Sequence, residues 1–548
     1  MFKMMMFLRK QAVLSFCVFA LVLLAACTPQ TVTVEKTVTQ VVEVEKVVEK
    51  VVEKEVLVTP VPQPKKAIIG MGELVSSLDP PTDWAIAATN IHMSMFDCLV
   101  WRNRTTAAFE PWLAESYEAL DDTTWRFNLR KGIKFHNGED FKSDAVAWTY
   151  NRILADETMI TAKQWTFIKE VKVIDDYTVD IVTGSAQPAM LSKMAGTGCG
   201  IQAPIHGKKQ ADAKAEFAPV GTGPFMFKEM VKDDHITMIA NPDYWQGKPD
   251  IDELVWRSIP ETSTRVASLL AGEIDFATGV PTQDWATVDN NPGTSVTEFL
   301  SNRTMLIALR TGPSTPMPDF KGVTTNKKIR QAIGYAIDRR TLLEVVNGMG
   351  IPTLSRVTPP TLGWSPKFYD QYGEFNPDKA RELLKEAGYN NEVLTFHAST
   401  AWLYGKDVAE TVAAMLKDVG LNIDLQLMDT TTFREQIYAP NKNLEIYMDA
   451  LGNSFFDPWI TMKEFETGQK QRSGWINAEV EKLLVDAGSN MDPESRRAQF
   501  VRVQEIIVEE VPHVYLYTMK DAYGKSDRME FSMNPDGFLW FGFSKITN

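Results

Sequence analysis

The chain has 548 residues, of which 44% are hydrophobic and 23% are charged, and its formal net charge is −14. One hydrophobic core does not organise a chain of this length, so several domains are expected. The body carries no run rich in Lys and Arg. Because phosphate contacts require clustered cations, this composition argues against a nucleic-acid ligand.

The N-terminal segment has the pattern of a signal peptide. Lys3, Arg9 and Lys10 precede an apolar run from Ala12 to Ala26, which is shorter than the ~20 residues of a membrane-spanning helix. The run leads into the tetrapeptide LAAC, which resembles a bacterial lipobox. Cleavage before Cys27 and attachment of lipid to that cysteine are therefore expected; the alternative is an uncleaved anchor helix.

The next segment, from Thr31 to Val58, is of low complexity. Its β-branched residues recur at alternating spacings of three and four, and this heptad-like seam comprises Val34, Thr37, Val41, Val44, Val48 and Val51. A high β-branched content also suits an extended chain. We interpret the segment as a stalk, either a short coiled coil or a disordered spacer, which the proline-containing residues 59–64 end as a stiff linker.

The chain contains four cysteines. Cys17 is lost with the signal peptide and Cys27 takes lipid, so Cys98 and Cys199 remain in the body. Outside the cytoplasm these two can form a disulfide. Two buried free thiols are the alternative, because the sequence gives no distance between them.

One stretch of the body predicts a strand, a turn and a helix in a row. Polar and apolar residues alternate from Thr124 to Arg130, which is the period of a half-buried strand. Asn137-Gly138 marks a tight turn, since both residues tolerate a positive φ. Ser143 or Asp144 is then expected to N-cap a helix. The buried face of this helix is expected to comprise Val146, Tyr150, Ile153 and Leu154.

Strands and helices are also expected along the rest of the body. Short apolar runs predict strands at 67–71, 393–396 and 423–427 and a hairpin over 171–182, and a mixed segment at 91–101 predicts a helix followed by a strand. Helical spacing and capping residues predict helices at 264–271, 326–347, from 376–378 to Gly388, and from 492–494 to Pro512. Alternation of the two kinds of element gives the class α/β.

The exact sequences of several motifs give further evidence beyond these patterns. LRKGIKFHNGEDFKSDAVAWTYNRI, at 129–153, closely resembles the signature of the peptide/nickel-type extracellular solute-binding proteins of ABC transporters, family 5. PVGTGPF at 219–225, NPDYWQG at 241–247, LAGEIDF at 270–276 and IRQAIGYAID at 329–338 also resemble family segments and occur in the family's order. The resemblance covers about residues 67 to 545, nearly the whole mature body.

The resemblance implies a two-lobed, periplasmic-binding-protein-like fold (type II) with an extra domain inserted in the first lobe. Carried over to this chain, lobe I takes about 66–105, 218–304 and 511–548, the inserted domain takes 106–217 and lobe II takes 305–510. The signal peptide occupies 1–26, and the lipid anchor and stalk occupy 27–65.

The sequence gives no sign of catalytic or metal chemistry. None of the six histidines has a second histidine at metal-ligand spacing, and neither G-x-S-x-G nor H-E-x-x-H occurs. We therefore expect no catalytic residue, no metal and no cofactor, although a triad assembled from distant residues would leave no such motif. His136 lies inside the signature, and a structural hydrogen bond beside the turn is its expected role, with a ligand role as the alternative.

The segment before Pro458 is the expected ligand region. In peptide-binding relatives an aspartate four residues before this proline pairs with the α-ammonium group of the peptide, and here that position is Ser454, which carries no charge. Asp449 and Asp457 are nearby but out of register. Phe455 and Phe456 either stack on a ligand or belong to the core. The expected ligand-binding residues are Leu451, Gly452, Asn453, Ser454, Phe455, Phe456, Thr278, Trp475 and Tyr517.

The resemblance also implies a function. We expect an extracytoplasmic receptor of an ABC importer, anchored to the bacterial cell membrane by the lipid on Cys27, monomeric, and delivering its ligand to permease and ATPase subunits. The ligand is expected to be a peptide or, because of Ser454, an oligosaccharide or other neutral solute. A secreted hydrolase is the competing class of function.

Overall fold

The computed structural model describes residues 64–547, except 76, 84, 104–105, 158, 214–217, 313–318, 401, 403, 439–443, 454, 467–472 and 534–536. The predictions for the signal peptide, Cys27 and the stalk lie outside the described residues, as does Ser454. All described residues belong to one compact unit, Pro62–Asn548.

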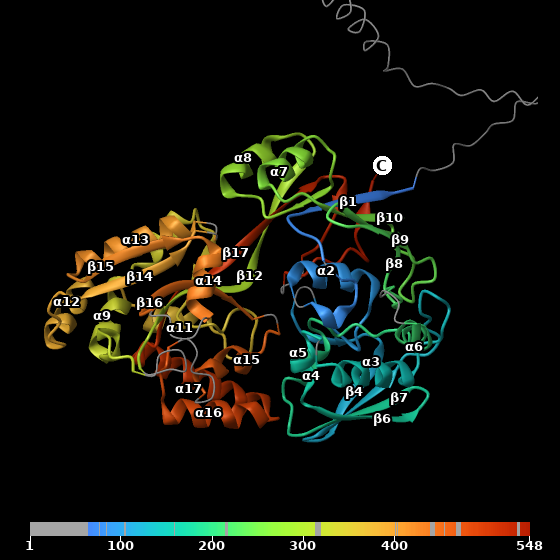
Figure 1. Ribbon diagram of the computed structural model, residues 1–548, viewed down its shortest axis with the longest axis horizontal. Helices are drawn as coiled ribbons and strands as arrows, with labels where there is room; N and C mark the ends of the chain where they lie inside the picture. Colours follow the sequence, from blue (N-terminus) through green and yellow to red (C-terminus); the bar gives the residue numbers. More distant parts are fainter. Residues whose placement is uncertain are drawn as a thin grey trace, which may run out of the picture. The chain divides into compact units, whose positions relative to one another are not determined.

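A mixed sheet is the frame of this unit. Among the described residues it has eleven strands, in the order β15-β14-β16-β12-β17-β11-β1-β10-β9-β8, and β13 pairs with β17 outside this path (Figure 1). The strands are β1 (Lys66–Met71), β8 (Phe225–Val231), β9 (His235–Ala240), β10 (Glu253–Ser258), β11 (Phe276–Thr278), β12 (Thr294–Leu309), β13 (Gly350–Pro352), β14 (Val393–Ser399), β15 (Asn422–Met428), β16 (Ile446–Gly452) and β17 (His513–Ser526). The strands expected near 67–71, 393–396 and 423–427 are confirmed.

Two long strands connect the halves of the sheet. β12 and β17 pair antiparallel from Thr294↔Ser526 to Ala308↔His513, with a shift in register between Leu300 and Thr304. β12 continues across the border expected between residues 304 and 305, so hydrogen bonding marks no break there. The expected domain boundaries stay a prediction.

Helices cover both faces of the sheet where β12 and β16 pair. Met305 and Ile307 are buried against one layer, which includes α9 (Lys327–Ala336) and α13 (Gly405–Asp418). Leu306 is buried against α16 (Ala478–Ser489) and α17 (Pro493–Glu510). Successive side chains of a strand point to opposite faces, so each face of β12 has its own hydrophobic core.

The stretch around the family signature folds as predicted, with one difference. β5 (Thr124–Leu129) alternates between half-buried and buried residues and lies in a four-stranded sheet with β4 (Ala114–Asp121), β7 (Thr178–Thr183) and β6 (Ile168–Asp175). α3 (Ser143–Ala155) buries Val146, Tyr150 and Ile153. The expected N-cap is wrong, because Lys142 takes that position and the Ser143 hydroxyl donates to the Asp175 carbonyl at 2.5 Å.

The prediction of one helix over 326–347 is also wrong. The chain forms α9 (Lys327–Ala336) and α10 (Arg339–Val345) with a break between them. The Asn326 side chain accepts from the Lys328 amide in the first helix, and the Asp338 side chain accepts from the Arg340 amide in the second. The apolar spacing continues through the break, so the second cap, which satisfies an otherwise unpaired amide, is the signal that was missed.

The remaining elements are mostly as expected. α12 (Pro377–Glu386) begins after Asn376, whose side chain accepts from the Lys379 amide, and α17 has Asp492 as its N-cap. The other helices and short strands are α2 (Ile86–Met95), α4 (Ala162–Trp165), α5 (Met190–Met194), α6 (Pro204–Ala213), α7 (Thr262–Leu270), α8 (Thr282–Asn290), α11 (Pro366–Tyr372), α14 (Thr430–Tyr438), α15 (Pro458–Met462), β2 (Val100–Arg102), β3 (Phe109–Pro111), β18 (Met529–Glu530) and β19 (Lys545–Ile546), with 3-10 turns at Pro80–Thr82, Val323–Thr325 and Lys463–Phe465.

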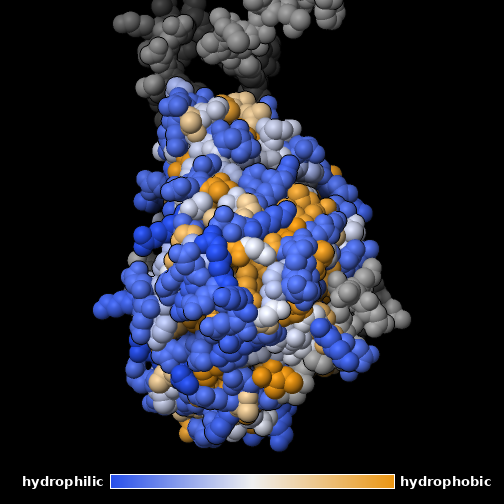
Figure 2. Space-filling view, turned by 90° about the vertical axis from the view of Figure 1, so that its left-hand side faces the viewer, coloured by the Kyte–Doolittle hydropathy of each residue, from blue (hydrophilic) through white to orange (hydrophobic). Residues whose placement is uncertain are grey.

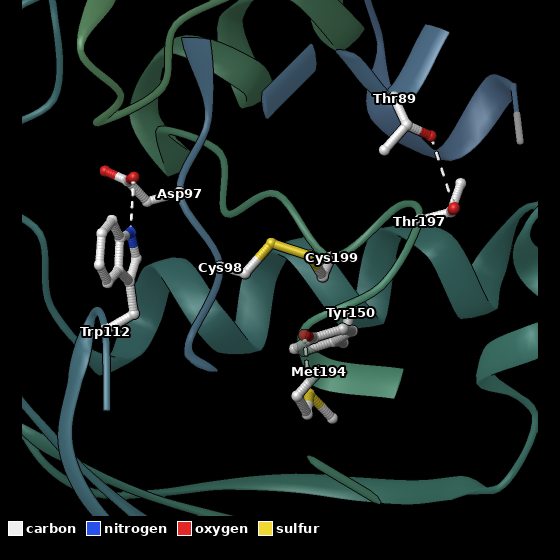
Figure 3. Close-up of a disulfide and its surroundings, with 8 residues drawn as sticks. All are labelled: Thr89, Asp97, Cys98, Trp112, Tyr150, Met194, Thr197 and Cys199. Carbon is white, nitrogen blue, oxygen red and sulfur yellow. Dashed lines mark hydrogen bonds between the residues drawn. A yellow bond between two sulfur atoms is a disulfide. The ribbon is translucent and has the colours of Figure 1, made fainter. Parts of the chain in front are cut away.

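Cys98 and Cys199 form a disulfide (Figure 3). The two Cα atoms are 5.3 Å apart and the bond closes a sequence separation of 101 residues. It links the segment before β2 to the segment after α5, and both cysteines are buried. Of the two alternatives that the sequence leaves open, the structure therefore has the disulfide.

The face seen in Figure 2 is mainly hydrophilic, with hydrophobic residues showing between the polar ones. Among the described residues no helix is long and apolar enough to span a membrane.

Candidate functional site

The predicted ligand segment is a tight turn at the end of β16. Gly452 is the last residue of the strand and pairs with Arg303 of β12. The Asn453 amide donates to the Asn302 carbonyl at 3.1 Å, and the Phe456 amide donates to the Asn453 carbonyl at 3.0 Å. Phe456 has φ 54°, a left-handed conformation that is uncommon for a residue other than glycine. The turn is therefore fixed by the sheet behind it.

This turn contacts a distant part of the chain. Arg102 of β2 donates from Nη2 to the Phe455 carbonyl at 2.9 Å, and its guanidinium lies 4.4 Å from the centroid of the Phe456 ring. The Ser192 hydroxyl of α5 donates to the same carbonyl. Gly196 faces the Phe455 ring so closely that a Cβ there would lie 2.9 Å from two ring atoms. Two phenylalanines in the second half of the chain are thus held by β2 and α5.

The sequence alone did not predict that Arg102 and Ser192 contact the turn. Arg102 is 353 residues from Phe455, Ser192 is 263 residues away, and neither lies in a quoted motif. A lone Arg or Ser carries no local signal of a long-range contact. Only the fold brings them to the turn.

Asp457, the acid directly before Pro458, forms an ion pair within the protein. Arg496 donates from both Nη atoms to the two carboxylate oxygens of Asp457, at 2.7 and 2.9 Å, and both side chains are buried. Asp457 also accepts from the Trp459 amide at 3.0 Å and is the N-cap of α15. To pair with an ammonium group of a ligand, Asp457 would have to leave a buried bidentate ion pair.

The other acid of the segment lies inside the sheet. Asp449 is in β16 opposite Leu306 of β12, is 7% exposed, and accepts from the Ala450 amide at 2.8 Å. It is held in the antiparallel ladder between β16 and β12 and precedes the turn.

Cations surround the turn. Arg356 donates to the Gly452 carbonyl at 2.8 Å and pairs with Glu464, and Arg303 pairs with Asp521. Two lysines near the turn, Lys193 and Lys463, form no ion pair with a carboxylate among the described residues. Their ammonium groups instead lie over the rings of Phe167, at 3.9 Å, and Trp459, at 5.1 Å.

Lys193 lies in an environment that opposes its charge. Desolvation, together with the positive charge of Lys463, lowers the pKa of Lys193 to about 8, and Asp457 opposes this shift. The coupling shows that Lys193 of α5 is close to the residues that follow the turn. An additional cation there would be repelled and an anion would be attracted.

Several buried polar atoms at the turn have no partner among the described residues. Both side-chain atoms of the Asn453 amide and Nδ2 of Asn302 are in this state, although the two residues are 2% and 4% exposed. The hydroxyls of Thr304 and Thr518, opposite each other in β12 and β17, are also unpaired. Buried polar groups are nearly always hydrogen-bonded to protein, water or ligand. These amides and hydroxyls could bond to a polar solute or to water.

Three predicted ligand residues lie away from the turn. Thr278 is in β11, where its hydroxyl donates to the Gly70 carbonyl at 3.4 Å, and it lines a hollow with Arg265 and Tyr523. Trp475 packs edge-on against Phe465 in the core formed by α16 and α17. Tyr517 is 2% exposed in the core on the other face of the sheet. A ligand contact by any of the three stays a prediction.

His136 has the structural role expected of it. Its Nε2 shares a 2.9 Å hydrogen bond with the Gly223 carbonyl, and its amide donates to the Gly221 carbonyl at 2.9 Å. Burial lowers the pKa of His136 to about 4, so the ring is neutral near pH 7. No group of three or more His, Cys, Asp or Glu side chains is arranged to hold a metal ion in the described part of the chain.

The chain is similar to known proteins in sequence and in fold. The model of the bacterial extracellular solute-binding proteins, family 5 Middle, matches residues 108–473. The oligopeptide-binding protein AppA of Bacillus subtilis (strain 168) is 26% identical over 449 residues, which are 76% of this chain and 80% of the relative. Heme-binding protein A of Haemophilus influenzae is 26% identical over 454 residues, 77% of this chain and 81% of the relative. Among solved structures, HbpA2 of Haemophilus parasuis superposes with a TM-score of 0.77 at 23% identity, covering 88% of this chain and 100% of that one.

Proposed function

Because the chain belongs to the bacterial extracellular solute-binding proteins of family 5, we propose that it is the substrate-binding lipoprotein of an ABC importer. It captures a peptide or a related solute between its two lobes and delivers it to the permease. The observation that carries the proposal is the contact of the Phe455–Phe456 turn with Arg102 and Ser192, which joins β16 to β2 and α5. A ligand held at this contact would touch both lobes at once, so binding energy would favour the closed arrangement.

The relatives support binding rather than catalysis. Their names describe binding of oligopeptide, heme and glutathione, which are chemically diverse solutes. Because these solutes are so different, membership of the family does not identify the ligand of this protein. The ligand class therefore has to be inferred from the side chains at the turn.

We propose that the ligand site does not select a free α-ammonium group. Asp457 is paired with Arg496, and Asp449 lies within the sheet, whereas Lys193 and Lys463 place positive charge beside the turn. A buried ammonium group without a carboxylate partner is penalised by roughly several kcal/mol. The side-chain amide of Asn453, which has no hydrogen-bond partner among the described residues, offers both a donor and an acceptor. A blocked or acidic peptide, or a neutral solute such as an oligosaccharide, suits these groups better than a peptide with a free amino terminus.

The remaining parts of the proposal concern the whole receptor. The lipid on Cys27 anchors the protein outside the cytoplasm, the stalk holds the body away from the membrane, and a monomer meets two permease subunits and their ATPases. Lobe I, the inserted domain and lobe II follow the boundaries expected from the family. No catalytic step is proposed.

The experiment that tests the ligand class is calorimetry of the body, residues 64–548, with short peptides and their N-acetylated forms. Native mass spectrometry of solutes carried through purification selects the peptides or sugars to try first. We expect the acetylated forms to bind at least as tightly as the free amines. A strong preference for the free amine would overturn this ligand class but leave the receptor function intact, whereas release of a chemically altered ligand would contradict the receptor function itself.

A further inference from the structure

A cavity apart from the turn is lined by residues that the expected boundaries assign mostly to lobe II and, at the start of β17, to lobe I. Its volume is about 470 Å³, and it is lined by residues of α9, α10, α11, α17 and the start of β17. None of its lining residues belongs to the Asn453–Phe456 turn or contacts it through a described hydrogen bond. Volumes of 300–1,000 Å³ are typical of small-molecule sites. The cavity is therefore large enough for a ligand of its own.

Arg339 is the buried cation of this cavity. It is 5% exposed, and its Nε donates to the Tyr515 carbonyl at 2.6 Å. Among the described residues, neither Nη atom has a hydrogen bond and no carboxylate forms an ion pair with the guanidinium. Desolvation lowers the pKa of Arg339 to about 10, so the group stays charged at neutral pH. A buried guanidinium that lines a cavity with two free donor atoms presents the geometry that a carboxylate accepts in a bidentate manner.

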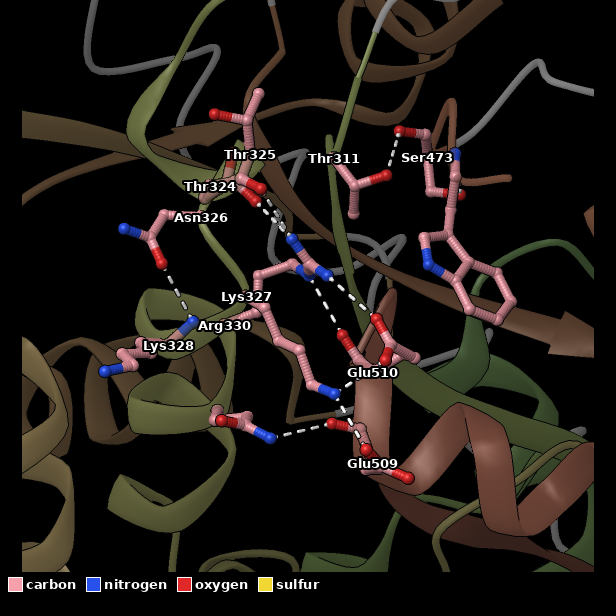
Figure 4. A network of polar contacts seen from close by, with 12 residues as sticks. Thr311, Thr324, Thr325, Asn326, Lys327, Lys328, Arg330, Ser473, Glu509 and Glu510 are labelled. Carbon is pink, nitrogen blue, oxygen red and sulfur yellow. Dashed lines mark hydrogen bonds and ion pairs between the residues drawn. The ribbon is translucent and has the colours of Figure 1, made fainter. Parts of the chain in front are cut away.

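Three other buried arginines of the described chain, Arg496, Arg330 and Arg265, have more complete sets of partners. Arg496 has Asp457 as a bidentate partner. Arg330 donates to three backbone carbonyls and lies 3.7 Å from a carboxylate oxygen of Glu510 (Figure 4). Arg265 has no carboxylate, but its three nitrogens bond to three backbone carbonyls and the Thr262 hydroxyl. Among the described residues Arg339 forms no ion pair and donates to one backbone carbonyl, although the nearby Asp338 carboxylate and Tyr369 favour its charge.

The residues that line the cavity restrict the kind of ligand that could reach Arg339. Its floor is apolar and buried, with Leu354, Ile507, Val511 and Val514 between 1% and 8% exposed. Tyr335 and Tyr372 supply half-buried aromatic rings at the side. Such a floor suits the flat or apolar body of a small organic molecule.

The rim restricts the charge of the ligand. It carries three carboxylates, Glu374, Glu505 and Glu509, of which Glu505 pairs with Arg502 and Glu509 pairs with Lys327. A dianion such as phosphate would gain one buried cation but would be repelled by these acids. A single negative charge at the floor, with an apolar body toward the rim, meets less repulsion.

We propose that this cavity is a second ligand site, separate from the turn at the end of β16, which takes a small monocarboxylate with a flat apolar body. The carboxylate accepts from the two Nη atoms of Arg339, and the body packs against the valines and tyrosines. The inference does not depend on which solute the importer carries, because the two sites share no residue.

The test is fluorine NMR of the body, residues 64–548, with 4-fluorobenzoate and 4-fluorophenylacetate as probes and their neutral amides as matched controls. The fluorine resonance of at least one acid should broaden when the acid binds, and the matching amide should bind at least tenfold more weakly. Arg339→Gln should weaken binding of the acid at least tenfold. Because that variant changes a buried residue, Gly334→Leu gives an independent check. Gly334 lines the cavity and lies on a helix. A Cβ at this position would have only the Val511 side chain within 4 Å, so a leucine side chain would occupy cavity space without changing Arg339.

A variant at the turn separates the two sites. Arg102→Gln should leave binding of the acid unchanged if the acid occupies the second cavity. The proposal is overturned if neither acid binds, if the amide binds as tightly as the acid, or if Gly334→Leu binds as well as the wild type. Loss of binding in Arg102→Gln with retention in Gly334→Leu would place the probe at the turn and also overturn it.

Discussion

The guanidinium of Arg102 lies 4.4 Å from the centroid of the Phe456 ring while its Nη2 donates to the carbonyl of the preceding residue, 353 positions along the chain from Arg102. A cation over an aromatic ring contributes about 0.5–2 kcal/mol, depending on how far the pair is removed from water. Arg102 is 3% exposed, so the contact is at the upper part of that range. It stabilises the arrangement in which β2 and the end of β16 are together.

Replacement of Arg102 by Ala should weaken ligand binding. The variant loses the hydrogen bond and the cation–π contact that hold the turn, so the ligand-bound arrangement becomes less stable and the dissociation constant should rise roughly tenfold, equivalent to about 1.4 kcal/mol. Calorimetry with the ligand identified after purification measures the change. Arg381→Ala, which removes exposed pairs with Asp378 and Asp418, is the matched control. Equal affinities in the Arg102 variant and the wild type would show that the contact does not take part in binding.

Gly196→Ala tests the position of the Phe455 ring. A Cβ at residue 196 would lie 2.9 Å from two atoms of that ring, so the ring has to move or the turn has to separate from α5. We expect faster hydrogen exchange of the amides around Phe456 and weaker ligand binding. Gly184→Ala is the control, because nothing lies within 4 Å of a Cβ there. Unchanged exchange in the Gly196 variant would mean that the ring does not occupy this position in solution.

Asp457→Asn should destabilise the fold without changing ligand selectivity. The substitution leaves Arg496 buried without its partner, and breaking one side of a buried ion pair costs about 3–5 kcal/mol. Urea denaturation measures the loss in the free energy of unfolding. Asp418→Asn removes an exposed partner of Arg381 and should cost no more than about 1 kcal/mol. If the Asp457 variant instead kept its stability and lost ligand binding, Asp457 would be a ligand residue.

His136 should make stability fall as the pH falls below 6.5. The unfolded chain takes up a proton on this residue near pH 6.5, whereas the folded chain does so only near its lowered pKa of about 4. Between these values the unfolded state holds more protons, so the free energy of unfolding decreases with decreasing pH, by at most about 1.4 kcal/mol per pH unit from this group. Denaturation curves of wild type and His136→Gln from pH 7 to 4 should converge toward low pH. A constant difference between them would contradict the lowered pKa.

Cys27→Ser tests the anchor. If lipid on Cys27 holds the protein at the membrane, the variant should lose its lipid, and the protein should appear in the medium once its signal is cleaved. Mass spectrometry of the wild type for an acylated Cys27 is the direct measurement. A wild-type N-terminus without lipid would exclude the anchor even if the variant stayed with the membrane through an uncleaved signal.

Local patterns in the sequence predicted much of the secondary structure. The alternation from Thr124 to Leu129 predicted β5, and Asn376 followed by proline predicted the start of α12. These signals work because strand period and helix caps depend on residues within a few positions of each other. The break at Asp338 was missed for a related reason: a cap inside a continuous apolar pattern competes with that pattern, and packing against the sheet decides between them.

The sequence by itself determined the class of fold, the family resemblance and the segment before Pro458 as the place to look for a site. The tertiary structure decided the rest. It joined Cys98 to Cys199, paired Asp457 with Arg496 and brought Arg102 and Ser192 to the turn. It also placed Arg339 in a cavity where no carboxylate of the described residues forms an ion pair with it. These outcomes depend on contacts between residues that are tens to hundreds of positions apart. Local periodicity carries no information about such contacts, because they form only when the strands and helices that carry the residues pack together.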